Sequence, residues 1–205
     1  MAIISNGTTI ADAGAFSVSL GSMVHIKTLT ASSSANLSFV HGSASVVLDS
    51  TYPIYVFKLI NIHPATNNVQ LMHNGSIDAG SNYNVAATTT TFEGEGSESA
   101  ANGTLGYISS HDHAQDTGGK KFTYNMGNDN DQGLSGEMIL FNPSSSTFMK
   151  HFLTKVSNYH QGDYEKNTYT GGYYNTTSDV DAIQFSMSSG NIDSGTIKLY
   201  GIKDS

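Results

Sequence analysis

The sequence predicts an all-β protein, an antiparallel jelly-roll-like β-sandwich with very little helix. Short segments of alternating apolar and polar residues recur at roughly ten-residue spacing, with Gly, Asn and Ser as turn residues between them. One long run, residues 52–62, is rich in β-branched and aromatic residues, as strands are. The C-terminal residues 182–202 contain two further segments with strand alternation. These three observations favour strands over helices throughout the chain.

The first half of the chain supplies strands in sequence order. Phe16, Val18 and Leu20 alternate with serines, and residues 24–29 and 37–40 predict two further strands. Residues 52–62 predict a strand that is buried on both faces, because the run is apolar without alternation. Pro64 is expected to end this strand, since proline cannot donate a ladder hydrogen bond.

A strand, a proline loop and a second strand occur twice. The segments INIHPATNNVQLMH and ILFNPSSSTFMKHF share this pattern. Two copies are too few for a solenoid. We therefore expect topologically equivalent hairpins in the two halves of the sandwich.

The middle of the chain has a different composition. Residues 79–131 are rich in Gly, Ser and Thr, which indicates long loops and short strands, with an edge strand at residues 88–92. We expect a single domain, residues 1–205, with a variable, loop-rich middle at residues 90–131.

The C-terminal segment is expected to close the sandwich as a hairpin. Residues 182–187 and 196–202 read as strands, and SSGNIDSG between them can form a tight connection. In the last strand Ile197 and Leu199 face one side, whereas Lys198 and Tyr200 face the other.

Composition narrows the function classes. The chain has 205 residues, a net charge of −8 and no cysteine. An acidic chain with scattered basic residues is not expected to bind nucleic acid, and a chain without cysteine has neither disulfides nor thiolate zinc sites. Apolar runs are too short to span a membrane, and the first residues lack the pattern of a secretory signal. We expect synthesis in a cytoplasm and stability from packing and oligomerisation.

Two segments are candidate metal sites. His111 and His113, with Asp116 nearby, would project from one face of a strand and could share a metal, although no further ligand is specified. Asp129 and Asp131 lie in GNDNDQG, whose oxygen-rich composition suits calcium, but the EF-hand register fails. The alternatives are a polar loop and an Asx-rich turn. We predict no cofactor, with calcium as the open alternative.

Catalytic signatures are weak in this sequence. G-x-S-x-G is absent, so the serines, His151 and His160 have no nucleophile motif to complete. Asp179 and Asp181 could form an acid–base pair on one strand face, or could protect a strand edge from aggregation. We therefore predict no catalytic residues and no enzyme, and a polysaccharide hydrolase is only a third possibility.

Five tyrosines are candidates for binding or interface contacts. Tyrosine suits protein contacts and sugar stacking, but some of the five could equally be core or strand-edge residues. The five are Tyr159, Tyr164, Tyr169, Tyr173 and Tyr174.

Several long segments resemble a known family. MGNDNDQGLSG, ILFNPSSSTFMKHF and GGYYNTTSDVDAIQFSMSSGNIDSGTIKLYGIK are similar to virion structural proteins of tailed bacteriophages, especially those of marine cyanobacteria. SLGSMVHIKTLTASSSANLSFVHG and YVFKLINIHPATNNVQL share the resemblance, and residues 90–125 fit it least. The resemblance implies a structural role in a particle and supplies no catalytic residues.

The expected function is a non-enzymatic virion structural protein. A capsid decoration or cement protein is favoured over a whole tail fibre, because no coiled-coil or collagen-like shaft is present. Its expected partners are copies of itself and the major capsid protein or tail proteins, without nucleic acid or membrane. The alternative is a tail-associated receptor- or carbohydrate-binding β-sandwich that recognises a host surface glycan. In either case the expected location is the virion, after synthesis in the host cytoplasm.

Overall fold

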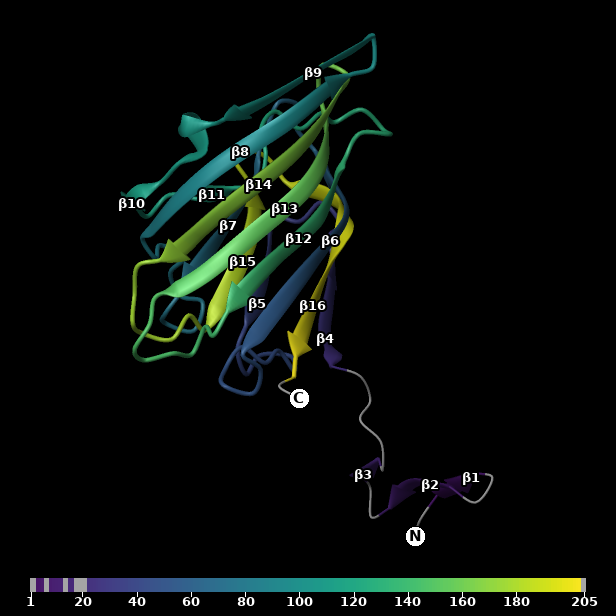
Figure 1. Cartoon of the computed structure of the whole chain (residues 1–205), viewed down its shortest axis with the longest axis vertical. Helices are drawn as coiled ribbons and strands as arrows, with labels where there is room; N and C mark the ends of the chain where they lie inside the picture. Colours follow the sequence, from purple (N-terminus) through teal and green to yellow (C-terminus); the bar gives the residue numbers. More distant parts are fainter. Residues whose placement is uncertain (1–2, 6–7, 13–14, 17–21, 204–205) are drawn as a thin grey trace.

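The computed structural model describes residues 3–5, 8–12, 15–16 and 22–203. In these residues the chain is all-β, and two antiparallel sheets, of nine and four strands, pack as a sandwich (Figure 1). The predicted fold class, an antiparallel β-sandwich with very little helix, is confirmed. Its jelly-roll character stays a prediction. No helix in the described part of the chain is long and apolar enough to cross a membrane.

The large sheet has nine of the described strands. They are β4 (Met23–Thr30), β6 (Ile54–Pro64), β8 (Ala87–Ser97), β9 (Ala100–Tyr107), β10 (Ala114–Asp116), β12 (Leu134–Phe141), β13 (Lys150–His160), β14 (Tyr164–Tyr174) and β16 (Ile192–Ile202). Their order is β10-β8-β14-β13-β12-β6-β16-β4, and β9 also pairs with β8.

The remaining described elements are shorter. The four-stranded small sheet, in the order β11-β7-β15-β5, contains β5 (Asn36–Val40), β7 (Leu71–Ser76), β11 (Lys120–Lys121) and β15 (Ala182–Met187). Near the N-terminus β1 (Ile3–Ser5), β2 (Thr8–Asp12) and β3 (Ala15–Phe16) form a separate three-stranded sheet. A 3₁₀ turn, η1, spans Ser109–His111. The predicted strand at Phe16, Val18 and Leu20 lies mostly outside the described residues.

Aromatic side chains join the two sheets. Phe57 projects from β6 of the large sheet, and its ring centroid lies 5.3 Å from that of Phe39 and 5.3 Å from that of Phe185. Phe39 and Phe185 come from β5 and β15 of the small sheet, and all three side chains are fully buried. Burying a side chain of this size stabilises a fold by roughly 1.5–3 kcal/mol. The core therefore lies between the sheets, where alternate residues of each strand meet.

Of the three predicted hairpins, two are instead connections that cross from one sheet to the other. Strands β6 and β7 lie in different sheets, so the first proline loop does not join paired strands. Strands β12 and β13 are paired along their length, so the second proline loop does close a hairpin. The C-terminal pair is also wrong as a hairpin, because β15 belongs to the small sheet and β16 lies between β6 and β4. A loop within a hairpin and a loop between the sheets both reverse the chain direction. The loop sequence therefore does not specify which sheet the next strand joins.

The predicted loop-rich middle contains a long hairpin. Strand β8 spans eleven residues, pairs with β14 over its whole length and lies inside the sheet rather than at its edge. Except for Ala87, its inward side chains are polar. Glu93 accepts a hydrogen bond from Thr168 at 2.8 Å and forms an ion pair with Lys166 at 2.7 Å. Because the buried residues that follow Ala87 in β8 are polar, this segment lacks the apolar–polar alternation that predicts a strand.

Candidate functional site

The outer face of the large sheet is the main candidate surface. We give this name to the face that is turned away from the small sheet, which lies behind it in Figure 1. An antiparallel sheet with one face in solvent usually has polar residues on that face. Here Phe92 and Leu153 are each 50% exposed on it. Large apolar side chains in this position commonly mark a contact surface.

Directly opposed residues on seven neighbouring strands form what we call the outer row. In strand order it consists of Tyr107, Phe92, Tyr169, Lys155, Glu137, Lys58 and Lys198. Opposed residues in a sheet share a face and lie close enough to contact one another. The row is therefore aromatic at one end and charged at the other.

Contacts within the outer row hold its side chains in place. The rings of Phe92 and Tyr169 stack with their centroids 5.0 Å apart and their planes within 5°. The Lys155 ammonium lies 5.5 Å from the centroid of Tyr169, within the range of a cation–π interaction. Lys58 forms an ion pair with Glu137. These contacts arrange aromatic, cationic and anionic groups in a fixed order.

An apolar depression of about 450 Å³ adjoins the outer row. Ile139 and Leu153, directly opposed on β12 and β13, line it together with Gly171 of β14. Since glycine has no side chain, the surface is hollow at this position. The depression can accept an apolar side chain from another molecule.

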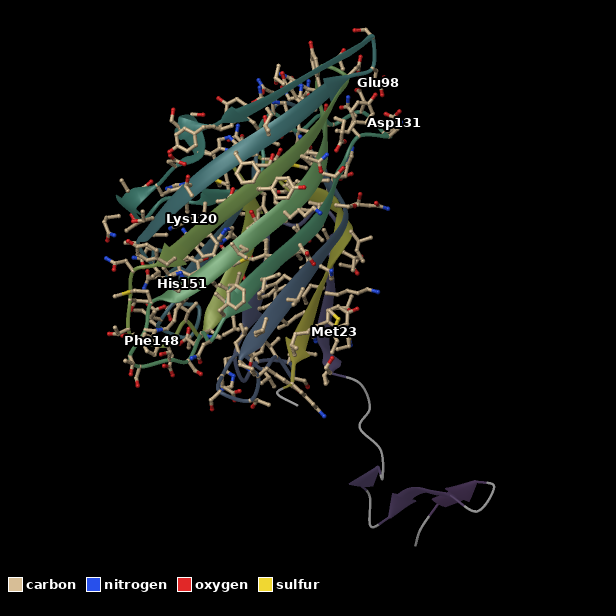
Figure 2. The ribbon with its side chains drawn as sticks, viewed as in Figure 1. Met23, Glu98, Lys120, Asp131, Phe148 and His151 are labelled. Atoms are coloured by element: carbon tan, nitrogen blue, oxygen red, sulfur yellow. The ribbon has the colours of Figure 1, made fainter. Side chains whose placement is uncertain are left out.

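A second hollow of about 510 Å³, the polar pocket, lies where several strands of the large sheet end. Its lining is uniformly polar and includes Asn61, His63, Asn130, Asp131, Gln132, Ser135, Ser157, Tyr159, Glu165 and Asp193. Figure 2 shows Asp131 and Glu98 together at this end of the sandwich and His151 and Phe148 at the other end.

Hydrogen bonds position several groups of the polar pocket. Ser157 donates to Glu165 at 2.9 Å, and the ring of His63 lies 3.6 Å from the Asp193 carboxylate. A hydrogen bond with the Glu98 carboxylate, assisted by desolvation, raises the pKa of Tyr159 to about 12. The phenol of Tyr159 therefore stays protonated at neutral pH and can donate a hydrogen bond. The described lining contains no lysine, so the pocket is unsuited to anions.

The candidate histidine pair does not have the predicted geometry. His111 ends the 3₁₀ turn η1, so the two side chains do not project from one face of a strand. His111 is buried, with its ring centroid 5.0 Å from that of Tyr124, and burial lowers its pKa to about 4. His113 instead contacts Asp116, at 2.7 Å. Each histidine therefore has its own environment.

The GNDNDQG segment forms a turn beside the polar pocket. The backbone oxygen of Asp129 contacts the ring of His63 at 3.1 Å, and Asp131 lines the pocket. Within the described residues, no three acidic, histidine or cysteine side chains are grouped so that they could hold a metal ion. The absence of a cofactor stays a prediction.

The five candidate tyrosines separate into different environments. Tyr174 is fully buried, and its hydroxyl lies 2.7 Å from Nδ1 of His73. Tyr169 and Tyr173 project from β14 onto the outer face, opposite Phe92 and Thr88. Tyr159 lines the polar pocket, and Tyr164 is 37% exposed at the start of β14. Tyr174 is therefore a core residue, whereas a binding or interface role for the other four stays a prediction.

The two candidate acidic residues near the C-terminus are not on a strand face. Asp179 and Asp181 precede β15 in an irregular segment. One carboxylate oxygen of Asp181 accepts a hydrogen bond from the backbone of Ala79 at 2.9 Å. Such a hydrogen bond fixes the conformation of a loop, which is a structural role for Asp181.

Sequence reasoning missed most of the outer face. Glu137 and Ile139 alternate with buried residues in β12, and Leu153 and Lys155 do so in β13. That alternation could have identified the outward set. It does not show that Phe92 belongs to this set, because the sequence predicts only an edge strand at residues 88–92 in a loop-rich region.

The comparisons with known proteins give no family assignment. No protein-family model, curated protein or solved structure matches the chain.

Proposed function

We propose that this chain is a non-enzymatic structural protein of a tailed-bacteriophage virion that associates with copies of itself through the outer face of its large sheet. The observation that carries the proposal is the apolar and aromatic surface formed by Phe92, Leu153, Ile139 and Tyr169. The resemblance of the sequence to virion structural proteins supports the particle as the location.

Capsid decoration is the favoured role within the virion. A sandwich without a fibrous shaft suits attachment to a lattice better than extension from a tail. The outer face would bind a neighbouring copy, and other surfaces would contact the major capsid protein or tail proteins. No cofactor is needed for this function.

Sedimentation velocity of the full chain over a range of concentrations tests self-association. We expect a reversible oligomer, and we expect Leu153→Lys to weaken it at least about ten-fold, because a buried contact would then contain an unpaired charge. Ile77→Lys is the matched control, since Ile77 is also exposed but lies in the loop after β7 of the small sheet. A monomer at every concentration would refute the proposal.

The second candidate function is binding of a host surface glycan, and the polar pocket favours it. Carboxylates, amides and hydroxyls can pair with sugar hydroxyls, and Tyr159 supplies an aromatic wall. Calorimetric titration with neutral oligosaccharides of N-acetylglucosamine or galactose would show saturable binding that Tyr159→Ala abolishes. A folded protein that binds none of these sugars would count against this candidate.

A further inference from the structure

The outer row has a self-complementary order of chemical groups. We propose that two copies of the chain pack with their outer faces together, about a two-fold axis that runs parallel to the strands between β12 and β13. This inference rests on the proposed self-association and specifies its geometry. In a two-fold interface, every contact between two different residues occurs twice with the roles of the copies exchanged.

The centre of the interface combines a charge pair with apolar packing. The two-fold axis reverses the row, so Lys155 of one copy lies opposite Glu137 of the second copy. The adjacent row is reversed in the same way, which places Leu153 opposite Ile139 of the second copy. Leu153 of each copy then packs on Ile139 of the other, within the apolar depression. An apolar contact beside a charge pair gives both affinity and a defined register.

The flanks of the outer row match in the same arrangement. Lys58 of one copy lies opposite Tyr169 of the second, at about 7 Å from the axis for strands about 4.8 Å apart. Lys198 lies opposite Phe92 at about 12 Å from the axis on the same spacing. Both contacts place an ammonium group near an aromatic ring, which is a favourable pairing.

The backbone geometry permits this packing. The pairings of β12 with β13 and of β13 with β14 are continuous, without a bulge, so the row is regular at its centre. Two sheets commonly pack face to face about 10 Å apart, with strands within about 30° of each other. A lysine side chain is long and flexible enough to accommodate the displacement that such an angle produces at the flanks.

Charge distribution favours a second copy over a different acidic partner. All nine basic residues of the chain are lysines, and three of them, Lys58, Lys155 and Lys198, lie in the outer row. A uniformly acidic partner would satisfy these lysines but would repel Glu137, at the centre of the row. A second copy supplies an acid at the centre and aromatic rings at the flanks.

Two charge-reversal variants, mixed, test this geometry. Lys155→Glu alone places two like-charged pairs in the interface, and so does Glu137→Lys alone. We expect each to weaken self-association at least about ten-fold, because each loses two attractive contacts and gains two repulsive ones. An equimolar mixture should form a heterodimer, since Glu at position 155 of one copy then faces Lys at position 137 of the other. Native mass spectrometry would detect it.

The mixture separates this inference from a fold defect. Lys155 and Glu137 also oppose each other within one chain, and mixing cannot repair that intramolecular pair. If wild type associates but the mixture forms no heterodimer, the proposed geometry is wrong while self-association stands. If wild type stays monomeric, the proposed function fails as well.

A measurement on the wild type does not depend on the folding of either variant. Carbodiimide cross-linking of a mixture of ¹⁴N- and ¹⁵N-labelled protein should yield isotopically mixed peptides that join Lys155 to Glu137. Cross-links of that pair only within one isotope, in a sample that is oligomeric, would overturn the inference.

Discussion

At the scale of single residues, the most unusual group is a buried basic cluster beneath the large sheet. His73 of β7 is fully buried, and its ring packs on Phe152 with centroids 4.8 Å apart. Lys120 of β11 is also buried and donates to the Asn74 side chain at 2.7 Å and to the Val85 carbonyl at 2.8 Å. Neutral acceptors therefore hold the Lys120 ammonium.

Both basic groups have lowered pKa values. Burial, reinforced by the positive charges of Lys120 and His113, holds the pKa of His73 well below its usual value. Burial also lowers the pKa of Lys120 to about 8, with the Asp116 carboxylate acting in the opposite direction. At neutral pH His73 is therefore uncharged, and its protonation opposes folding.

Acidification from pH 7 to pH 5 should destabilise the fold through His73. The unfolded chain protonates this histidine near its ordinary pKa whereas the folded chain does not, so stability falls as pH drops through that value. The loss is about 2 kcal/mol for one histidine over this interval. Denaturant unfolding at the two pH values measures this effect. Between pH 7 and pH 5, the free energy of unfolding of His73→Gln should fall by about 2 kcal/mol less than that of the wild type. The exposed His25→Gln is the control, and an unchanged pH dependence in His73→Gln would contradict this explanation.

Residue roles were only partly predictable from the sequence. Alternation in the last strand put Ile197 and Leu199 on the same side, and in the structure both are fully buried. The same rule would have separated Tyr173 from Tyr174, had the boundaries of β14 been known. The environment of His111 depends on a 3₁₀ turn and on Tyr124 from a later segment, which no local spacing specifies.

At the scale of secondary-structure elements, β16 has a larger role than closing the chain. It pairs with β6 on one side and β4 on the other, and thus lies inside the large sheet. Its inward residues Ile197 and Leu199 contribute to the core.

Deleting residues 196–202 should abolish soluble folding. The deletion leaves β6 and β4 without their shared partner and exposes core residues such as Phe57. Solubility on expression and circular dichroism would measure the effect. A truncation after Ile202 is the control, because it leaves the strand intact. A soluble, cooperatively folded deletion variant would show that β16 is dispensable.

The positions of the strands were predicted better than the neighbours with which they pair. Strands near residues 54–64, 134–141 and 150–160 follow from β-branched and apolar runs, and the structure contains them. Strands β7 and β15 join the small sheet because their apolar side chains complete the core between the two sheets. That choice involves residues far apart in sequence, so no local turn motif could specify it. For β8 the sequence predicts only a short edge strand at residues 88–92, because after Ala87 its buried face carries threonines and Glu93 instead of apolar residues.

At the scale of the whole molecule, composition already indicated the class of fold. Low charge, many hydroxyl and amide side chains and regular strand spacing led to a β-sandwich, as the structure confirms. Composition could not reveal that one sheet is about twice as wide as the other, with nine and four strands in the described residues. The outer face of the larger sheet is broad and faces away from the small sheet, and the proposed assembly would bury this face.

The reactivity of the lysines tests the central claim most directly. Acetylation can be followed by mass spectrometry in full-length protein, at concentrations above and below the association midpoint found by sedimentation. We expect Lys58, Lys155 and Lys198 to react several-fold more slowly in the associated state, because the second copy covers the outer face. Lys121 of β11, in the small sheet, should react equally in both states. Equal reactivity of the three outer-face lysines in both states would contradict assembly through this face.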